Sequence, residues 1–165
     1  PPPPPFSSRR RHTRCAIKSR GLGDVYKRQV QMSPDEWESL CDGCGLCCLV
    51  KIEDADSGIV FNTSVSCRQL DIETCTCRDY ENRLADVSMC IQLTLEHLPA
   101  LTWLPETCAY KRLYQGKDLP VWHPLITGDK DSVHDAGFSV RWFAQSEEYI
   151  HPDQLTDFII DIDEK

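Results

Sequence analysis

The sequence lacks long hydrophobic runs, internal repeats and the common nucleotide-binding and nucleophile motifs. No apolar stretch approaches the ~20 residues of a membrane-spanning helix. The sequence contains no phosphate loop, dinucleotide fingerprint or nucleophile elbow, which are the best-known sequence signatures of enzymes. The first residues are basic and lack the apolar segment of a secretory signal peptide, so we expect a cytoplasmic protein.

Positive charge is scarce beyond the first 29 residues. Residues 1–29 carry eight Arg and Lys side chains against one Asp, a net charge of +7, which leaves −15 for the rest of a chain whose formal charge is −8. Binding a nucleic-acid backbone requires Lys and Arg to displace counterions, and anionic membrane surfaces repel an acidic domain. We therefore expect no nucleic-acid and no membrane partner. The sequence names no protein partner, and we expect a monomer.

The first 29 residues differ in character from the rest of the chain. A run of five prolines precedes the strings SSRRRHTRC and GLGDVYKRQ, which resemble conceptual translations of sequencing-adapter DNA. At face value the segment is a basic arm able to touch nucleic acid. We instead expect residues 1–29 to be a disordered, non-native, adapter-derived extension, and we set Cys15 aside with it. The cysteine-cluster metal-binding domain is then 30–145, and 146–165 is an acidic C-terminal tail.

Cysteine, in contrast, is concentrated in one short run. Four thiols fall within eight positions, at Cys41, Cys44, Cys47 and Cys48, and the residues between them are an Asp, two glycines and a Leu. Thiolates this close repel one another unless a cation lies between them, and soft sulfur ligands favour zinc, copper(I) or iron–sulfur clusters. The glycines allow the tight turns that such a site needs. A disulfide network is disfavoured by the cytoplasmic compartment and by the odd total of nine cysteines beyond residue 29.

Five further cysteines complete that total: Cys67, Cys75, Cys77, Cys90 and Cys108. Cys90 and Cys108 are isolated, so burial as apolar fillers is the alternative to ligation for these two.

The spacing of the first three thiols matches the C-x2-C-x2-C ligation of a bacterial 4Fe-4S cluster, but the usual Cys-Pro is missing. Cys48 or a distant cysteine would have to supply the fourth thiolate. Zinc sites more often show two separated CxxC pairs, which Cys75-x-Cys77 fits imperfectly. The pattern favours an iron–sulfur cluster slightly over zinc. It allows one cluster plus one zinc, or two sites that share ligands.

Local patterns predict a small irregular α+β domain of short helices and strands, joined by long loops and organised around the metal site. Ser33, Pro34 and Glu36 form the start of a capped helix. Two short apolar runs around an acidic turn indicate a hairpin. Val140–Phe143 fits either a short strand or part of a helix. The predicted elements are a helix over Pro34–Leu40, strands over Leu49–Ile52 and Gly58–Phe61, and helices over Leu93–Leu98 and Pro105–Tyr114, the last with Cys108 in its first turn and a stop at Gly116.

Several strings together resemble the YcgN family, a family of small bacterial cysteine-cluster proteins. These are the strings DEWESLCDGCGLCC, CRQLD, TCTCRDY, WLPETCAY, WHPL, SVH and SVR, which lie between residues 32 and 141. The family belongs to a wider CxxCxxCC group described as zinc- or iron-chelating. The resemblance implies that all nine cysteines from Cys41 to Cys108 belong to the metal-binding pattern. It supplies no reaction, because the flagellin lysine methylase of the wider group shares only the cysteine run.

The leading hypothesis is thus a metal-binding protein that serves structure, metal handling or redox sensing. The alternative is a metal-dependent enzyme, methyl-transfer-like or hydrolytic, for which Asp42 and His123 are the only candidate bases. For His123, between Trp122 and Pro124, a structural hydrogen-bonding role is the simpler expectation. A thiol-redox module is the least favoured hypothesis, because Cys44-x-x-Cys47 lacks the flanking βαβ pattern of thioredoxins.

Overall fold

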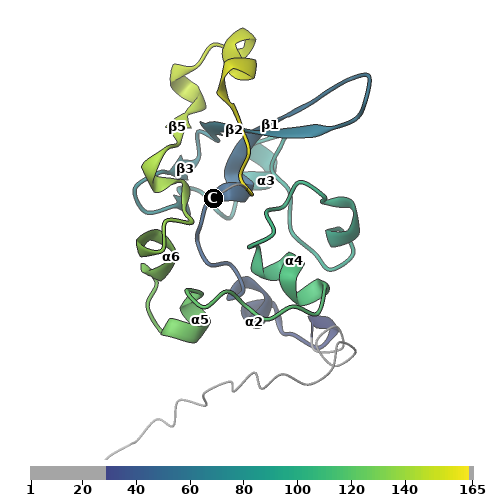
Figure 1. Cartoon of the computed structure of the whole chain (residues 1–165), viewed down its shortest axis with the longest axis vertical. Helices are drawn as coiled ribbons and strands as arrows, with labels where there is room; N and C mark the ends of the chain where they lie inside the picture. Colours follow the sequence, from purple (N-terminus) through teal and green to yellow (C-terminus); the bar gives the residue numbers. More distant parts are fainter. Residues whose placement is uncertain (1–28, 164–165) are drawn as a thin grey trace, which may run out of the picture.

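The computed structural model describes residues 29–163 (Figure 1). The expectations for the adapter-like segment and Cys15 therefore lie outside the described residues, apart from Gln29, which is buried and donates its Nε2 to the carbonyl oxygen of Tyr110 at 3.3 Å. The fold is the predicted α+β arrangement of short elements. Its helices are α2 (Pro34–Glu38), α3 (Arg83–Asp86), α4 (Ala109–Tyr114), α5 (Pro124–Thr127) and α6 (Ser132–Asp135). Its strands are β1 (Leu49–Glu53), β2 (Val60–Ser66), β3 (Leu70–Asp71), β4 (Thr76–Cys77), β5 (Gln145–Ser146) and β6 (Ile159–Ile160).

Strand β2 organises the main sheet. It pairs with β1 as an antiparallel hairpin, which confirms the predicted hairpin, and the turn between the strands is closed by the Asp54 carboxylate, which accepts bonds from the backbone and hydroxyl of Ser57. The other edge of β2 pairs in parallel with β5 and antiparallel with β6. The chain end coloured yellow in Figure 1 thus returns to the sheet. Strands β3 and β4 form a separate two-stranded ladder.

Helix α2 begins as predicted. The Ser33 hydroxyl accepts a bond from the amide of Glu36, and the Glu36 carboxylate accepts one from the amide of Ser33, so both halves of the capping box are present. The helix ends at Glu38 rather than at Leu40. Leu40 follows in a tighter turn, with its amide bonded to the carbonyl of Trp37, and is 2% exposed.

The predicted helix over Leu93–Leu98 is wrong. Residues 91–94 have no regular structure, and only the 3₁₀ turn Leu98–Ala100 follows. The indole of Trp37 donates to the carbonyl oxygen of Leu93 at 2.8 Å, and that oxygen would be an acceptor within the helix. A contact between distant segments therefore overrides the local pattern.

Helix α4 starts later than predicted, at Ala109 instead of Pro105. Residues 105–108 form a turn in which the amide of Cys108 donates to the carbonyl of Pro105 at 3.0 Å. Cys108 is consequently the residue that precedes the helix and not a member of its first turn. The segment Val140–Trp142 is a 3₁₀ turn, which decides between the strand and helix expected there.

Two hydrophobic clusters support the fold, and the cysteine run connects them. The helical core consists of Leu40, Leu98, Leu104, Ala109, Tyr110, Leu113 and Leu119. The sheet core consists of Leu46, Leu49, Leu70, Cys75 and Val140. Because Leu40 is buried in the first cluster and Leu49 in the second, both ends of the segment 41–48 are anchored by side-chain burial.

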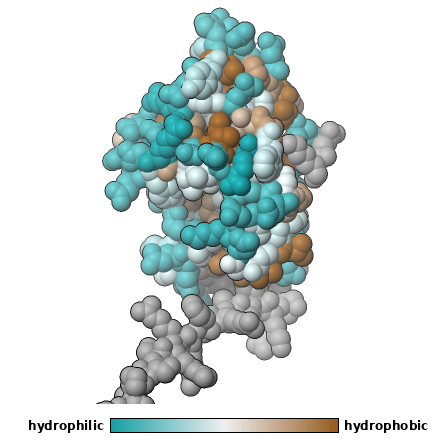
Figure 2. Space-filling model, turned by 90° about the vertical axis from the view of Figure 1, so that its left-hand side faces the viewer, coloured by the Kyte–Doolittle hydropathy of each residue, from teal (hydrophilic) through white to brown (hydrophobic). Residues whose placement is uncertain are grey.

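The molecular surface is largely hydrophilic on the face shown in Figure 2, where hydrophobic residues form separate patches. Exposed apolar side chains of the described chain include Val121, Leu125 and Trp142, and scattered apolar residues of this kind are ordinary on protein surfaces. None of the described helices combines the length and the apolar character that crossing a membrane requires.

Candidate metal centre

The cysteine run folds as two glycine turns followed by a 3₁₀ turn. Gly43 and Gly45 both have φ of +75°, a conformation that favours glycine. The Asp42 carboxylate accepts a hydrogen bond from the amide of Cys44 at 3.1 Å, and the 3₁₀ turn Leu46–Cys48 then leads directly into β1. Asp42 is 8% exposed, so its charge is held within the loop. The glycines thus have the turning role predicted for them.

Four of the predicted ligand residues line one pocket. The thiols of Cys41, Cys44 and Cys47 come from the cysteine run, and that of Cys108 comes from the residue before α4. The cavity measures about 30 Å³. Its other lining residues are Leu40, Asp42, Leu93, Leu104, Pro105, Ala109 and Tyr110. As residues, Cys41 and Cys47 are exposed, whereas Cys44 and Cys108 are partly buried.

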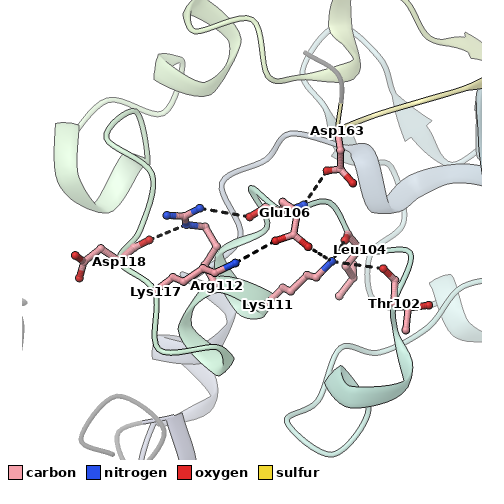
Figure 3. A network of polar contacts seen from close by, with 8 residues as sticks. All are labelled: Thr102, Leu104, Glu106, Lys111, Arg112, Lys117, Asp118 and Asp163. Atoms are coloured by element: carbon pink, nitrogen blue, oxygen red, sulfur yellow. Dashed lines mark hydrogen bonds and ion pairs between the residues drawn. The ribbon is translucent and has the colours of Figure 1, made fainter. Parts of the chain in front are cut away.

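Polar contacts hold the segment around Glu106, which lies between the pocket-lining residues Pro105 and Cys108 (Figure 3). The ammonium of Lys111 donates to the carbonyl oxygen of Leu104 at 2.6 Å and pairs with the Glu106 carboxylate at 2.8 Å. Lys117 pairs with the same carboxylate, and the amide of Glu106 donates to the Asp163 carboxylate at 3.0 Å. The segment that carries Cys108 is therefore held from both α4 and the C-terminal residues.

The surroundings of the pocket oppose negative charge on most of its thiols. Burial raises the pKa of Cys108 to about 11 and raises that of Cys44 strongly, and the Asp42 carboxylate adds to the shift at Cys44. The thiol sulfurs of Cys47 and Cys48 lie 3.9 Å apart. Their hydrogen bond lowers the pKa of Cys47 and raises that of Cys48. Accumulating several thiolates here requires a cation among them.

The cysteine thiols are suitable ligands for a soft metal, although their side chains do not converge on one point. All nine cysteines from Cys41 to Cys108 are free thiols. Among residues 29–163, no three His, Cys, Asp or Glu side chains converge closely enough to hold a metal ion as they stand. Four thiols around one small cavity nevertheless match the ligand count of a closed zinc site or of a 4Fe-4S cluster.

Apart from Cys48, which ends the cysteine run, the remaining cysteines occupy two other places. Cys67, Cys77 and Cys90 are near enough that the first two each raise the pKa of Cys90, although burial is the larger cause. The amide of Cys67 donates to the carbonyl oxygen of Cys48 at 2.9 Å, which joins this group to the end of the cysteine run. Cys75 is buried in the sheet core, against which Cys44 and Cys48 also pack; it is 6% exposed, and its thiol donates to the carbonyl of Ile72. Burial as an apolar core residue, the alternative to ligation for Cys90 and Cys108, is thus observed for Cys75.

Lys51 is a member of the site that the sequence did not indicate. Its Nζ donates to the carbonyl oxygens of Cys47 at 3.0 Å and Leu49 at 2.6 Å, and it lies 4.1 Å from the ring centre of Trp103. Burial lowers its pKa to about 8, although Cys47 and Cys48 act in the opposite direction. No sequence signal marks this residue, because its position depends on the side chain folding back along β1.

His123 has the structural role expected of it. The side chain is 0% exposed, and its Nδ1 accepts a hydrogen bond from the amide of Leu125, which caps α5. Nε2 therefore carries the proton and donates to the carbonyl oxygen of Leu40 at 3.0 Å. Both ring nitrogens are engaged, so His123 has no free nitrogen with which to act as a base.

Comparison with known proteins places the chain in a family. The model described as "CxxCxxCC: Putative zinc- or iron-chelating domain" matches residues 40–109. A UPF0260 protein of Rhizobium johnstonii is 53% identical over 135 residues, which cover 82% of this chain and 85% of that protein. A UPF0260 protein of a Caulobacter species is 54% identical over 78% of this chain and 80% of its own length. The chain belongs to the UPF0260 family.

A third UPF0260 relative, from Mesorhizobium japonicum, is 49% identical over 82% of this chain and 93% of its own length. No solved structure matches the chain. The matched range 40–109 begins one residue before Cys41 and ends one residue after Cys108. All nine cysteines considered above therefore fall inside the part of this UPF0260 chain that resembles a chelating domain.

Proposed function

We propose that this UPF0260 chain, as a protein of the YcgN kind, is a cytoplasmic metal-binding protein. Its principal ligands are Cys41, Cys44, Cys47 and Cys108, and the metal is an iron–sulfur cluster or zinc. The observation that carries the proposal is the single small cavity shared by these four thiols. The other five cysteines, Cys48, Cys67, Cys75, Cys77 and Cys90, form the wider set from which a second or shared site would draw.

The size of the cavity favours a bound metal over an organic substrate. Sites for small organic molecules typically measure about 300–1,000 Å³, whereas this cavity measures about 30 Å³. An enzyme would also need an open coordination position beside a substrate pocket. The alternative of a methyl-transfer or hydrolytic enzyme therefore has less support than a role in metal handling, structure or redox sensing.

Metal binding would require the thiols to converge further. Each cysteine has staggered rotamers that move its sulfur without moving the backbone. Exposed Cys41 and Cys47 have the most room to rotate, and Gly43, which has no atom within 4 Å of an added β-carbon, leaves open space beside the loop. Free energy gained on ligation would stabilise the fold, since the four ligands join the cysteine run to the start of α4.

The identity of the metal decides what the site supplies. The C-x2-C-x2-C spacing favours a 4Fe-4S cluster, which would provide one-electron redox chemistry. A zinc ion closed by four thiolates would provide structural stability alone. In both cases the role of the protein is to present four sulfurs and to hold the Cys108 segment against the cysteine run.

The test is the metal content of the full chain after purification without oxygen. Metal analysis and an absorption spectrum should show either about four irons and four sulfides per chain with a brown colour, or about one zinc per chain and no colour. Protein that is folded by circular dichroism but contains neither metal, and that acquires neither on reconstitution, would refute the proposal.

A further inference from the structure

A lysine lies against the cysteine run at the point where it enters the sheet. The ammonium group of Lys51 donates to the carbonyl oxygen of Cys47 at 3.0 Å and to that of Leu49 at 2.6 Å. It also lies 4.1 Å from the ring centre of Trp103, and Trp103 directly precedes the pocket residues Leu104 and Pro105. The cation is therefore in contact with both chain segments that supply thiols to the pocket.

The negative charge of the proposed metal–thiolate centre would favour a positively charged side chain beside it. Four thiolates around a zinc ion carry a net charge of −2, and the same ligands around an oxidised 4Fe-4S cluster also give −2. The buried Asp42 carboxylate lines the same cavity, and the chain beyond residue 29 is strongly acidic. Bringing these negative charges together at the pocket costs electrostatic free energy. A fixed cation nearby reduces that cost.

Lys51 differs in this respect from Lys111. Lys111 also donates to backbone carbonyls beside the pocket, at Leu104 and Thr102, but the Glu106 carboxylate at 2.8 Å neutralises it. Lys51 forms no ion pair with a carboxylate of the described residues. Its charge is thus available to the thiolates.

We propose that Lys51 is the charge-compensating, positioning residue of the thiolate centre. It offsets the negative charge of the metal-bound sulfurs, and it fixes the Cys47 end of the cysteine run against Trp103. The inference rests on the proposed function, since it requires a metal–thiolate site in this pocket. The competing explanation is that Lys51 only ties down the carbonyl groups of Cys47 and Leu49.

Three variants separate charge from structure, and Lys130→Met is the control, because Lys130 is an exposed lysine that does not line the pocket. Lys51→Gln retains a hydrogen-bond donor without the charge, Lys51→Met retains length without either, and Lys51→Arg retains the charge. Zinc affinity is measured on the full chain under argon by competition with a chromophoric chelator, after circular dichroism has shown that each metal-free variant is folded. We expect Lys51→Gln and Lys51→Met to bind Zn²⁺ about tenfold more weakly than the wild type.

Lys51→Arg should stay within about threefold of the wild type, and Lys130→Met within about twofold, because only the former position lies beside the thiolates and compensates their charge. If the wild type is reconstituted with iron and sulfide, Lys51→Gln should also have a lower reduction potential, since removing a positive charge disfavours the added electron. A wild type that binds Zn²⁺ while Lys51→Gln and Lys51→Met bind it equally well would refute the inference alone. A wild type that binds neither zinc nor iron would refute the proposed function and the inference with it.

Discussion

Gly45 packs so closely against Val140 that a β-carbon at position 45 would lie 2.7 Å from Cγ2 of Val140. The amide of Val140 also donates to the carbonyl oxygen of Cys44 at 2.9 Å, and Val140 is 0% exposed. The middle of the cysteine run is therefore fixed against the sheet core. The loop cannot take a side chain at this position without displacing a fully buried neighbour.

Gly45→Ala should consequently destabilise the protein and weaken metal retention. A positive φ costs an alanine about 1 kcal/mol, and overpacking against Val140 adds about 2 kcal/mol, so we expect a loss of about 3 kcal/mol in the free energy of unfolding. Gly43→Ala is the matched control, because Gly43 has the same φ of +75° but no atom within 4 Å of its added β-carbon. It should lose about 1 kcal/mol. Urea denaturation measures both, and equal losses would contradict the packing argument.

Cys108→Ser should abolish tight metal binding, because among the described residues Cys108 is the one cysteine lining the pocket that lies outside the cysteine run. Cys90→Ser is the control, since Cys90 is also partly buried but does not line that cavity. Metal content after anaerobic purification should fall severalfold in Cys108→Ser and stay near the wild-type value in Cys90→Ser. If Cys90→Ser lost its metal and Cys108→Ser kept it, the metal site would instead lie at the group formed by Cys67, Cys77 and Cys90.

Removal of the metal should lower the thermal stability of the wild type. A ligand present at a hundred times its dissociation constant stabilises the folded state by about 2.7 kcal/mol, which corresponds to about 10 °C in Tm for a domain of this size. Scanning calorimetry with and without a chelator measures the difference. The same chelator should leave the Tm of Cys108→Ser unchanged, and a chelator-dependent shift in that variant would show that Cys108 is dispensable.

Features set by neighbouring residues could be predicted from the sequence, and features set by distant contacts could not. The capping box of Ser33 and Glu36 and the β1–β2 hairpin depend on residues a few positions apart, and both are present. The helix expected over Leu93–Leu98 failed because Trp37, 56 residues away, takes the carbonyl oxygen of Leu93.

The candidate site shows the same division. The spacing from Cys41 to Cys48 indicated a compact set of thiols, and the glycines between them indicated the turns that the loop adopts. The proximity of Cys108 and the placement of Lys51 depend on how two segments pack across the pocket, which spacing does not encode. Family resemblance included Cys108 among the cysteines of the pattern, but it did not distinguish Cys108 from Cys75 in the sheet core.

His123 connects the cysteine run to α5, and this link makes a further prediction. Its ring is fully buried, and it bonds to the carbonyl oxygen of Leu40, one residue before Cys41, and to the amide of Leu125. His123→Ala would leave a cavity, an unpaired buried carbonyl at Leu40 and an uncapped amide at Leu125, so we expect a loss of about 4 kcal/mol in the free energy of unfolding.

His151→Ala is the matched control for this change. His151 also caps a turn, with Nδ1 accepting from the amide of Asp153 at 3.3 Å, but its side chain is 68% exposed. The loss of an exposed cap costs about 0.5–1 kcal/mol. Denaturation curves of the two variants, recorded without metal, separate burial from capping. If His123→Ala lost no more stability than His151→Ala, the ring would not be what holds Leu40, and the anchoring of the cysteine run would have to come from the Leu40 side chain alone.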